Sequence, residues 1–384
     1  MRVRGGFSAR VAAGFTPDES DGLRRAMAAW KRKGNAIHSY GKRLIDGMLA
    51  NGYPREFAER CFEQIKGFSE YGFPESHAAS FAILVYVSCW LKHHYPAEYA
   101  AALLNAQPMG FYRPAQIVRD AQDHGVEVRA VDVHDSEWDC TLEGDAIRLG
   151  MRLVKGLGRG QADRVVEAVR EHGVFESVES LWRRSGVRVA TLRALAHADA
   201  FTSLGLDRQR ALWMVKPLRD VEMPLFADHG GPDDDTAALP EAASSLRVVH
   251  DYETVGLSLK AHPVSFLREA LGRRGVVPAS DLRSELRCPP KRVVCVAGLV
   301  LCRQRPATAS GVVFITLEDE TGIVNLILWS DTFEKCRRVA RLSRMLLARG
   351  VVEREGEVVH LHVRHLESLD AMPDVPEVHS RDFH

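Results

Sequence analysis

The clearest chemical pattern in the sequence is a run of spaced glycines and basic residues, Lys155-Gly156-Leu157-Gly158-Arg159-Gly160. Glycines tolerate positive φ and let an anion come close to the backbone, and the free N–H groups at the start of a following helix can donate to it. Lys155 and Arg159 add positive charge beside this turn. A plain corner between two helices is the alternative, but the spaced glycines and flanking bases favour a turn that binds phosphate.

This turn resembles the helix-hairpin-helix motif, in which a Gly-x-Gly turn joins two helices and contacts the backbone of DNA. Contacts of this kind position a strand without reading its sequence, and they imply no catalytic role. A second, weaker copy is indicated around Ser185-Gly186-Val187. The residues of the first copy that we expect to bind DNA are Lys155, Gly156, Gly158, Arg159 and Gly160.

Carboxylates and metal-binding side chains give a weaker signal. Phosphoryl transfer uses carboxylates that hold two Mg²⁺ about 3.5 to 4 Å apart. The crowded aspartates are Asp132 with Asp135, in a segment of short strands, and residues 233–235, in a Gly- and Pro-rich linker, and we expect both groups to be solvated. His360 and His362 share a strand face without a third ligand, so we predict no metal site or other cofactor in this chain.

Composition predicts a multidomain protein that does not span a membrane. The 384 residues are 46% apolar and 27% charged, as in ordinary globular proteins, and the length predicts two to four compact units. The 51 basic and 51 acidic residues give zero net charge, so overall charge does not indicate nucleic-acid binding. The longest apolar stretch, Phe81 to Leu91, is too short to cross a bilayer. No signal peptide is recognised and the seven cysteines form no Cys-x-x-Cys pair, so we expect a cytoplasmic protein with reduced thiols.

Hydrophobic periodicity predicts helices over most of the first half of the chain. A helix over residues 78–94 has apolar side chains on most sides, and we expect it to be buried among neighbouring elements. Residues 126–150 alternate short apolar and polar runs, which predicts a small β segment, and helices resume from residue 160 to about residue 215. Residues 220–245 are rich in Gly, Pro and Asp and read as a solvated linker.

From Arg292 the apolar period changes to two, which predicts five strands with one helix, Asp331 to Ala340, after the third. This is the layout of an OB barrel, which often binds single-stranded nucleic acid, although another small β barrel is an alternative. The expected strands are Val293–Cys302, Val312–Glu318, Val324–Trp329, Met345–Glu353 and Val358–Leu366.

Aromatic and basic side chains of this barrel are candidates for DNA contact. Phe314 shares the more polar face of its strand with Thr316 and Glu318, so it is the preferred residue for stacking on bases. Trp329 and Phe333 are further aromatic candidates, and part of this set is expected to fill the barrel. The candidate phosphate partners are Arg303 and Arg305, together with Arg337, Arg338 and Arg341.

Three segments of the N-terminal part resemble the fingers domain of the bacterial C-family (DnaE-type) DNA polymerases. They are Leu23 to Met27, Tyr71 to Phe81, and Trp90 to Lys92 with Tyr95 to Tyr99. The hairpin and barrel units follow in the order of that family, so the resemblance covers nearly the whole chain. Pro74-Glu75 stands where replicative members have Asn-Lys, and this pair resembles the error-prone ImuC branch.

The resemblance implies how this part binds an incoming deoxynucleoside triphosphate (dNTP). Arg24 and Arg25 would contact the triphosphate, with Ser76 and His77 on the same face, although ordinary surface charge is an alternative for the two arginines. In the family, a palm domain with three metal-binding aspartates precedes the fingers, whereas here Met1 lies just ahead of them. We therefore expect a C-terminal portion that is inactive alone, with Mg²⁺ serving the full-length enzyme.

The implied partners are DNA, dNTP, an ImuB-like Y-family protein and, through it, the sliding clamp. Met223-Pro224-Leu225-Phe226 is a short apolar segment in the acidic linker. Met223, Leu225 and Phe226 could dock into a groove of the clamp, but the leading Gln of clamp-binding peptides is missing and packing against the chain's own domain is an alternative.

The expected fold class is a mainly α multidomain chain, with fingers and helix-hairpin-helix units and a C-terminal five-stranded β OB barrel. The expected function is that of the C-terminal part of an error-prone DNA polymerase used in damage-induced translesion synthesis. The alternative is a non-catalytic DNA-binding or scaffold module that uses its hairpin and OB units. The expected domains are 1–110 (fingers-like), 111–152 (small α/β connection), 153–218 (helix-hairpin-helix), 219–246 (acidic linker), 247–290 (connector), 291–369 (OB-fold) and 370–384 (tail).

Overall fold

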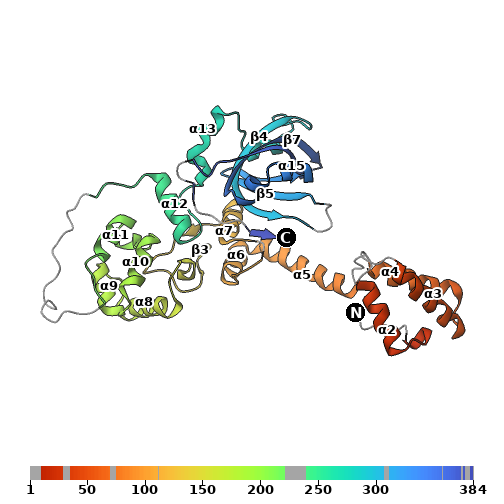
Figure 1. Cartoon of the computed structure of the whole chain (residues 1–384). Helices are drawn as coiled ribbons and strands as arrows, with labels where there is room; N and C mark the ends of the chain where they lie inside the picture. The colour runs from red at the N-terminus through yellow and green to blue at the C-terminus, as the bar shows by residue number, and fades with distance from the viewer. Residues whose placement is uncertain are drawn as a thin grey trace. The chain divides into compact units, whose positions relative to one another are not determined.

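The structure is a computed structural model that describes residues 10–28, 35–69, 75–110, 112–220, 239–306, 311–356, 358–372, 375–376 and 381–383 (Figure 1). The chain divides into two compact units, residues 1–94 and residues 95–384, and each is described here by itself.

The first unit is a small helical assembly. Its helices are α2 (Pro17–Ala28), α3 (Asn35–Ala50), α4 (Arg55–Ser69) and α5 (Glu75–His94). Thr16 and Glu19 start α2 with reciprocal bonds, since the backbone N–H of each donates to the side chain of the other, at 2.8 Å and 3.2 Å. Leu23, Leu44 and Met48 form its buried core with other apolar side chains.

Helix α5 is exposed in this structure, and the prediction that it is buried is wrong. Ile83 is 65% exposed and Tyr86 is 71% exposed, and Phe81, Leu84 and Val85 are also on the surface. Apolar side chains on all sides of a helix indicate that the helix favours burial. This pattern does not show whether elements that would bury the helix are present among the described residues.

The second unit begins with helices packed around a small three-stranded sheet. Strands β1 (Val128–Arg129), β3 (Ala146–Arg148) and β2 (Thr141–Glu143) lie in that order, with β1 parallel and β2 antiparallel to β3. Phe201 and Leu181 are among the fully buried residues of the shared core. The helices are α6 (Pro96–Asn105), α7 (Pro114–Asp123), α8 (Arg159–His172), α9 (Val178–Ser185), α10 (Val189–His197), α11 (Arg208–Val215) and α12 (Ser244–Thr254).

A connector of short helices links this part to a β barrel. It comprises the 3₁₀ helix Pro263–Leu267, α13 (Arg268–Arg273) and α14 (Ala279–Arg283). Ala279 and Leu282 pack in the same core as the barrel residues. The Asp319 carboxylate accepts a hydrogen bond of 2.8 Å from the backbone N–H of Ala279, which fixes the start of α14 to the barrel.

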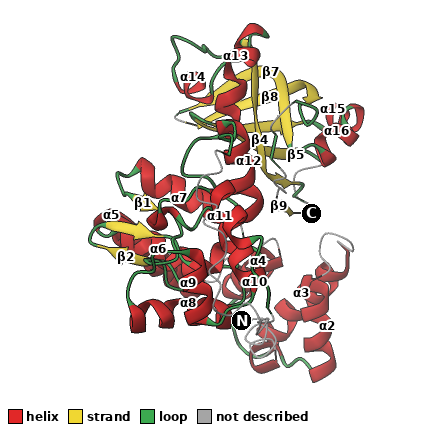
Figure 2. Cartoon of the chain, turned by 90° about the vertical axis from the view of Figure 1, so that its left-hand side faces the viewer, coloured by secondary structure: helices red, strands yellow, loops and turns green. Residues whose placement is uncertain are grey.

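Five strands close the barrel, shown in yellow in Figure 2. They are β4 (Val293–Gln304), β5 (Val313–Asp319), β6 (Gly322–Leu328), β7 (Met345–Glu355) and β8 (Val358–Ser368). The order β4-β5-β6-β8-β7 returns to β4, and only the β6–β8 contact within this ring is parallel. This topology confirms the predicted OB barrel.

Two details of the barrel were not predicted. The helix after the third strand is divided at Cys336 into α15 (Ser330–Lys335) and α16 (Arg337–Leu342). A short strand, β9 (Arg381–Phe383), pairs in parallel with the end of β4 at Cys302 to Gln304. Helices and a five-stranded barrel together confirm the predicted fold class.

Candidate nucleic-acid interface

The glycine turn is an exposed loop that leads directly into α8. Gly158 is the N-cap residue of α8, and Gly156 has φ of +80°, a conformation that favours glycine. The apolar side chains of Val154 and Leu157 are buried on either side. The backbone N–H of Lys155 donates to the carbonyl of Thr254 over 2.9 Å, which ties the turn to the end of α12. A 3₁₀ turn, Met151–Leu153, takes the place of the first helix of the hairpin.

Open space surrounds the glycines of this turn. A Cβ atom added at Gly156, Gly158 or Gly160 would meet no protein atom within 4 Å. Gly156 is explained by its positive φ, but Gly158 and Gly160 are not, since both have φ values that other residues adopt. The protein itself therefore gives no packing reason for glycine at these two positions. Close approach of a ligand to the backbone supplies one.

The charge around the turn suits an anion. The first backbone N–H groups of a helix lack intrahelical acceptors and lie at the positive end of its dipole. Lys155 and Arg159 are exposed beside them. Arg159 Nε lies 3.7 Å from a carboxylate oxygen of Asp163, and both side chains are about half exposed or more, so this pair is weak and leaves Arg159 available.

The second glycine turn forms a true hairpin between two α-helices. Helix α9 ends at Gly186, which has φ of 59°, and α10 begins at Val189. The first hairpin is bonded to it, because Gln161 Oε1 accepts from the backbone N–H of Arg188 and from Thr191 Oγ1, each at 3.0 Å. Residues 185–187 gave the weaker sequence signal, but they lie in the more complete helix-hairpin-helix geometry. The second turn has an α-helix on each side, whereas a 3₁₀ turn precedes the first.

A carboxylate of the chain lies at the start of α10. Asp220 Oδ1 accepts from the backbone N–H of Val189 over 2.6 Å. Backbone N–H groups at the start of a helix, like this one, are those that we expect to bind phosphate at the start of α8. Residues around it line a cavity of about 360 Å³, namely Trp182, Arg183, Gly186, Val187, Arg188 and Asp220.

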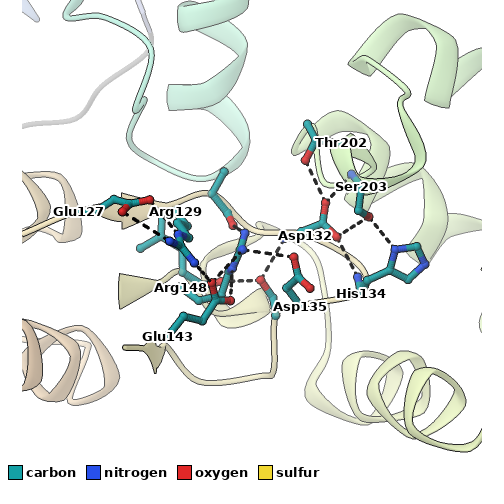
Figure 3. A network of polar contacts seen from close by, with 12 residues as sticks. Glu127, Arg129, Asp132, His134, Asp135, Glu143, Arg148, Thr202 and Ser203 are labelled. Carbon is teal, nitrogen blue, oxygen red and sulfur yellow. Dashed lines mark hydrogen bonds and ion pairs between the residues drawn. The ribbon is translucent and has the colours of Figure 1, made fainter. Parts of the chain in front are cut away.

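Asp132 is buried, so the prediction that it is solvated is wrong. Its side chain is almost fully covered and accepts hydrogen bonds from Thr202 Oγ1 (2.9 Å) and from both Oγ (2.6 Å) and N (2.9 Å) of Ser203 (Figure 3). The backbone N–H of His134 donates to it as well, over 2.9 Å. The carboxylate thus joins the small sheet to the segment after α10, and its oxygens are occupied by protein donors.

Ser203 also contacts the ring of His134, but Ser203, His134 and Asp132 do not form a nucleophilic triad. The distance from His134 Nδ1 to Ser203 Oγ is 2.7 Å, and His134 Nε2 accepts from the backbone N–H of Phe175 over 3.0 Å. Because Nε2 is an acceptor, Nδ1 carries the proton and the ring cannot take the proton of Ser203. This cluster is structural.

The neighbouring ion pairs hold the small sheet together. Glu143 accepts from Arg148 Nε over 2.7 Å and from Arg129 Nη1 over 2.6 Å, and Asp135 lies 3.2 Å from Arg148 Nη2 (Figure 3). The hydrogen bond from Arg148 keeps the pKa of Glu143 below its ordinary value of 4.5, opposed by desolvation. Asp135 is half exposed, as predicted, and pairs with Arg148 at the surface.

The outer face of the barrel carries a row of aromatic and apolar side chains. Strand register places Gln304, Phe314, Ile327 and His362 side by side. Phe314 is partly exposed on this face, as the strand parity predicted. Trp329, 55% exposed, stacks on the ring of His362 with centroids 6.0 Å apart. The face offers surfaces for stacking bases.

His362 was missed by sequence reasoning as part of this face. Trp329 Nε1 donates to His362 Nδ1 over 3.1 Å, and His362 Nε2 is paired with Glu353. The hydrogen bond from Trp329 uses Nδ1 of His362 as an acceptor, so the ring hydrogen is assigned to Nε2. The partners come from the residue that follows β6 and from β7, so no local sequence pattern contained this arrangement.

The candidate arginines of the barrel differ in their placement. Arg303 is only 8% exposed, and its guanidinium donates to the carbonyls of Ala340 (2.6 Å) and Ser343. It therefore fastens α16 to β4 and does not present its guanidinium on the surface as we expected. Arg305 is exposed, with its guanidinium 5.3 Å from the centre of the Phe333 ring. Phe333 belongs to the barrel core, so it is not a stacking residue.

The residues proposed for nucleotide and partner binding are only partly described. Arg24 and Arg25 lie in α2, and Ser76 and His77 lie in the first turn of α5, but the positions of these four side chains are outside the description. The turn at residues 71–74 and the linker residues Met223, Leu225 and Phe226 lie outside the described residues.

The described part of the chain shows neither a metal cluster nor a membrane-spanning helix. Among these residues, no group of three or more His, Cys, Asp or Glu side chains is placed to hold a metal ion. No helix within the described ranges combines the length and apolar character that crossing a bilayer takes.

Comparison with protein families identifies the same two modules. Residues 125–211 match the family described as a helix-hairpin-helix motif. Residues 294–369 match the family described as an OB-fold nucleic acid binding domain. The predicted hairpin and barrel are thus both confirmed as family domains.

Two solved structures are similar to this chain over a small part of its length. Asparaginyl-tRNA synthetase from Pyrococcus horikoshii matches with a TM-score of 0.22 and 24% identity over 27% of this chain and 24% of that one. OBody AM1L10 bound to hen egg-white lysozyme matches with a TM-score of 0.18 and 23% identity over 21% of this chain and 80% of that one.

Curated relatives match nearly the whole chain. It is 50% identical to Error-prone DNA polymerase 1 of Rhizobium meliloti (strain 1021), over 97% of this chain and 36% of the relative. It is 51% identical to Error-prone DNA polymerase 1 of Agrobacterium fabrum (strain C58 / ATCC 33970), over 93% of this chain and 34% of the relative. The chain spans about a third of the length of these relatives. Over nearly its whole length the chain is therefore similar to a part of the error-prone DNA polymerases, as its sequence resemblance predicted, and it carries hairpin and OB modules.

Proposed function

We propose that the chain is the DNA-handling, C-terminal part of an error-prone DNA polymerase that acts in damage-induced translesion synthesis in the cytoplasm. The first hairpin binds the phosphate backbone of duplex DNA, and the outer face of the barrel binds single-stranded template. Support comes from the relatives, which are named error-prone DNA polymerases, and from the two nucleic-acid-binding modules.

The open space at Gly158 and Gly160 is the observation that carries the DNA-binding part of this proposal. A Cβ atom would fit at either position without touching the protein, while the exposed start of α8 and the charge of Arg159 face the same solvent. A phosphate that approaches the backbone at this point accounts for both glycines. Fluorescence anisotropy with labelled duplex DNA tests it, and loss of binding in a Gly158→Ala, Gly160→Ala double variant is the expected result.

Nucleotide binding is proposed for the fingers-like unit. Arg24 and Arg25 grip the triphosphate, since adjacent guanidinium groups bind phosphate oxygens strongly, and Ser76 and His77 lie at the start of α5. Equilibrium binding of a fluorescent dNTP to the chain tests this assignment. An Arg24→Gln, Arg25→Gln variant with unchanged dNTP affinity would contradict it.

The longer family enzyme supplies catalysis in this proposal, with Mg²⁺ as its cofactor. A primer-extension assay with this chain alone distinguishes the proposal from a chain that is catalytic by itself. We expect DNA binding without extension. The alternative function, a non-catalytic DNA-binding or scaffold module, predicts in addition that joining the chain to the remainder of a family polymerase leaves extension unchanged.

Partner binding is proposed for the linker between the helical part and the barrel. Met223, Leu225 and Phe226 form an apolar segment among acidic residues and would dock on a sliding clamp or on an ImuB-like Y-family protein. Isothermal calorimetry of a peptide of residues 219–230 with the clamp tests the first possibility. Absence of binding would remove clamp docking from the proposal.

A further inference from the structure

A cavity of about 170 Å³ lies between the end of β4 and the two helices of the barrel. Among the described residues that line it, four of eight are arginines and none is acidic. The lining residues are Arg303, Gln304, Arg305, Val313, Phe333, Arg337, Ala340 and Arg341.

The floor of this cavity is apolar. Val313, Phe333 and Ala340 are all buried and belong to the barrel core. Arg303 lies beside them, and the carbonyls of Ala340 and Ser343 accept its hydrogen bonds. Arg303 thus places a guanidinium beside the apolar floor.

The rim consists of three exposed arginines. The Arg305 guanidinium is held over the Phe333 ring, which orients it above the floor. Arg337 Nη1 lies 3.5 Å from Glu334 Oε2, and both side chains are more than half exposed, so the pair contributes little and does not occupy Arg337. Arg341 lies one helical turn further along α16 and is also exposed. Planar guanidinium groups around one cavity match the oxygens of a phosphate.

Gln304 connects this cavity to the aromatic row on the barrel. It lines the cavity and is the register partner of Phe314 on β5, so the two residues are one strand spacing, about 5 Å, apart. A strand whose phosphate lies in the cavity can therefore place a neighbouring base against Phe314, and the next against Ile327 or Trp329.

We propose that this cavity binds one internal phosphodiester of single-stranded DNA whose bases stack along the outer face of the barrel. The inference rests on the proposed function, which it deepens by assigning the contact that fixes the strand on the barrel. The arginine rim supplies charge, the Phe314 row supplies stacking, and neither reads sequence.

Anisotropy with a labelled oligo-dT tests the proposal on the full chain. Arg305→Gln and Arg341→Gln should each weaken binding by roughly tenfold, the effect of losing a charge-assisted hydrogen bond. Each should also lower the slope of log affinity against log salt by about 0.7, the value for one phosphate of a single strand. The matched control is Arg273→Gln on α13, which removes the same charge from an exposed side chain outside the cavity and should leave affinity and slope near those of the parent.

Equal effects of all three variants, or of none, would overturn the proposal. An oligo-dT with a 5′-phosphate that binds much more tightly than one without it would assign the cavity to a strand end instead. Unchanged single-strand binding in the cavity variants, with duplex binding still lost in the hairpin variant, rejects the cavity alone. Absence of any DNA binding by the parent chain rejects the proposed function as well.

Discussion

Gln161 Oε1 lies 3.0 Å from the backbone nitrogen of Arg188 and so joins the first turn of α8 to the first turn of α10. The same oxygen accepts from Thr191, and Arg164 Nη1 donates to the carbonyl of Gly186 over 3.1 Å. Two glycine turns that are far apart in sequence are therefore held in a fixed relation. Gln161 belongs to the hairpin that we propose binds DNA. It therefore contributes to the packing of the two turns and also lies beside the proposed phosphate contact.

Two substitutions of Gln161 separate its contribution to stability from its effect on DNA binding. Gln161→Ala removes the acceptor of two donors and should lower the free energy of unfolding by about 1 to 2 kcal/mol. Gln161→Glu keeps an acceptor and should cost less stability, but it places a negative charge beside the turn and should weaken duplex binding more than Gln161→Ala does. Chemical denaturation and duplex anisotropy measure the two effects. The reverse order of DNA affinities would argue against phosphate binding near Gln161.

Gly160→Ala tests whether the glycine serves the fold or the ligand. Alanine fits the space and favours a helix by up to about 1 kcal/mol, so stability should be unchanged or higher. Duplex affinity should fall by roughly tenfold because the Cβ blocks one backbone contact. Gly272→Ala is the matched control, since Gly272 also lies in a helix with open space around it but is far along the chain from the turn. If Gly160→Ala and Gly272→Ala bind duplex equally well, the turn is not the contact.

Asp132→Asn should destabilise the chain without affecting DNA directly. The buried carboxylate accepts from four donors, and an amide nitrogen at one of its oxygens would face a donor, at a cost of about 2 to 4 kcal/mol. Thermal unfolding measures the loss. Duplex affinity, measured at a temperature where the variant is folded, should equal that of the parent. Stabilisation of the parent, but not of the variant, by Mg²⁺ would contradict the structural role.

Acid should weaken the small sheet through Glu143. The hydrogen bond from Arg148 lowers the folded-state pKa of this carboxyl below 4.5, so the unfolded chain binds the proton more readily. Its contribution to stability is complete above pH 4.5 and is lost as pH falls through the lowered pKa. Glu143→Gln should be less stable at pH 7 and should show a smaller loss of stability between pH 5 and pH 3. Glu269→Gln, which changes a highly exposed residue of α13, serves as the control and should retain the full acid dependence.

The barrel was predictable because its strands alternate with period two and local turns set their order. The predicted strand ends differ from β4 to β8 by only a few residues. The division at Cys336 was not predicted, because it interrupts a continuous helical pattern. The glycine turn was also predictable, since its requirements are local.

Contacts between distant segments were not predictable. Asp132 was expected in solvent because its partners, Thr202 and Ser203, are about 70 residues away along the chain. Arg303 resembled a phosphate ligand until the carbonyls of Ala340 and Ser343 were seen to accept its hydrogen bonds. In both cases a charged side chain met its partners through tertiary packing, which composition and spacing do not encode.

Salt-dependent duplex binding by the intact chain tests the central claim most directly. If exposed amides and cations of the hairpin hold DNA phosphates, unrelated duplex sequences should bind with the same affinity. The logarithm of that affinity should fall linearly with the logarithm of salt concentration, by about 0.9 for each phosphate contacted. An affinity that is independent of salt concentration or that depends on base sequence would contradict the claim, and so would the absence of duplex binding at low salt.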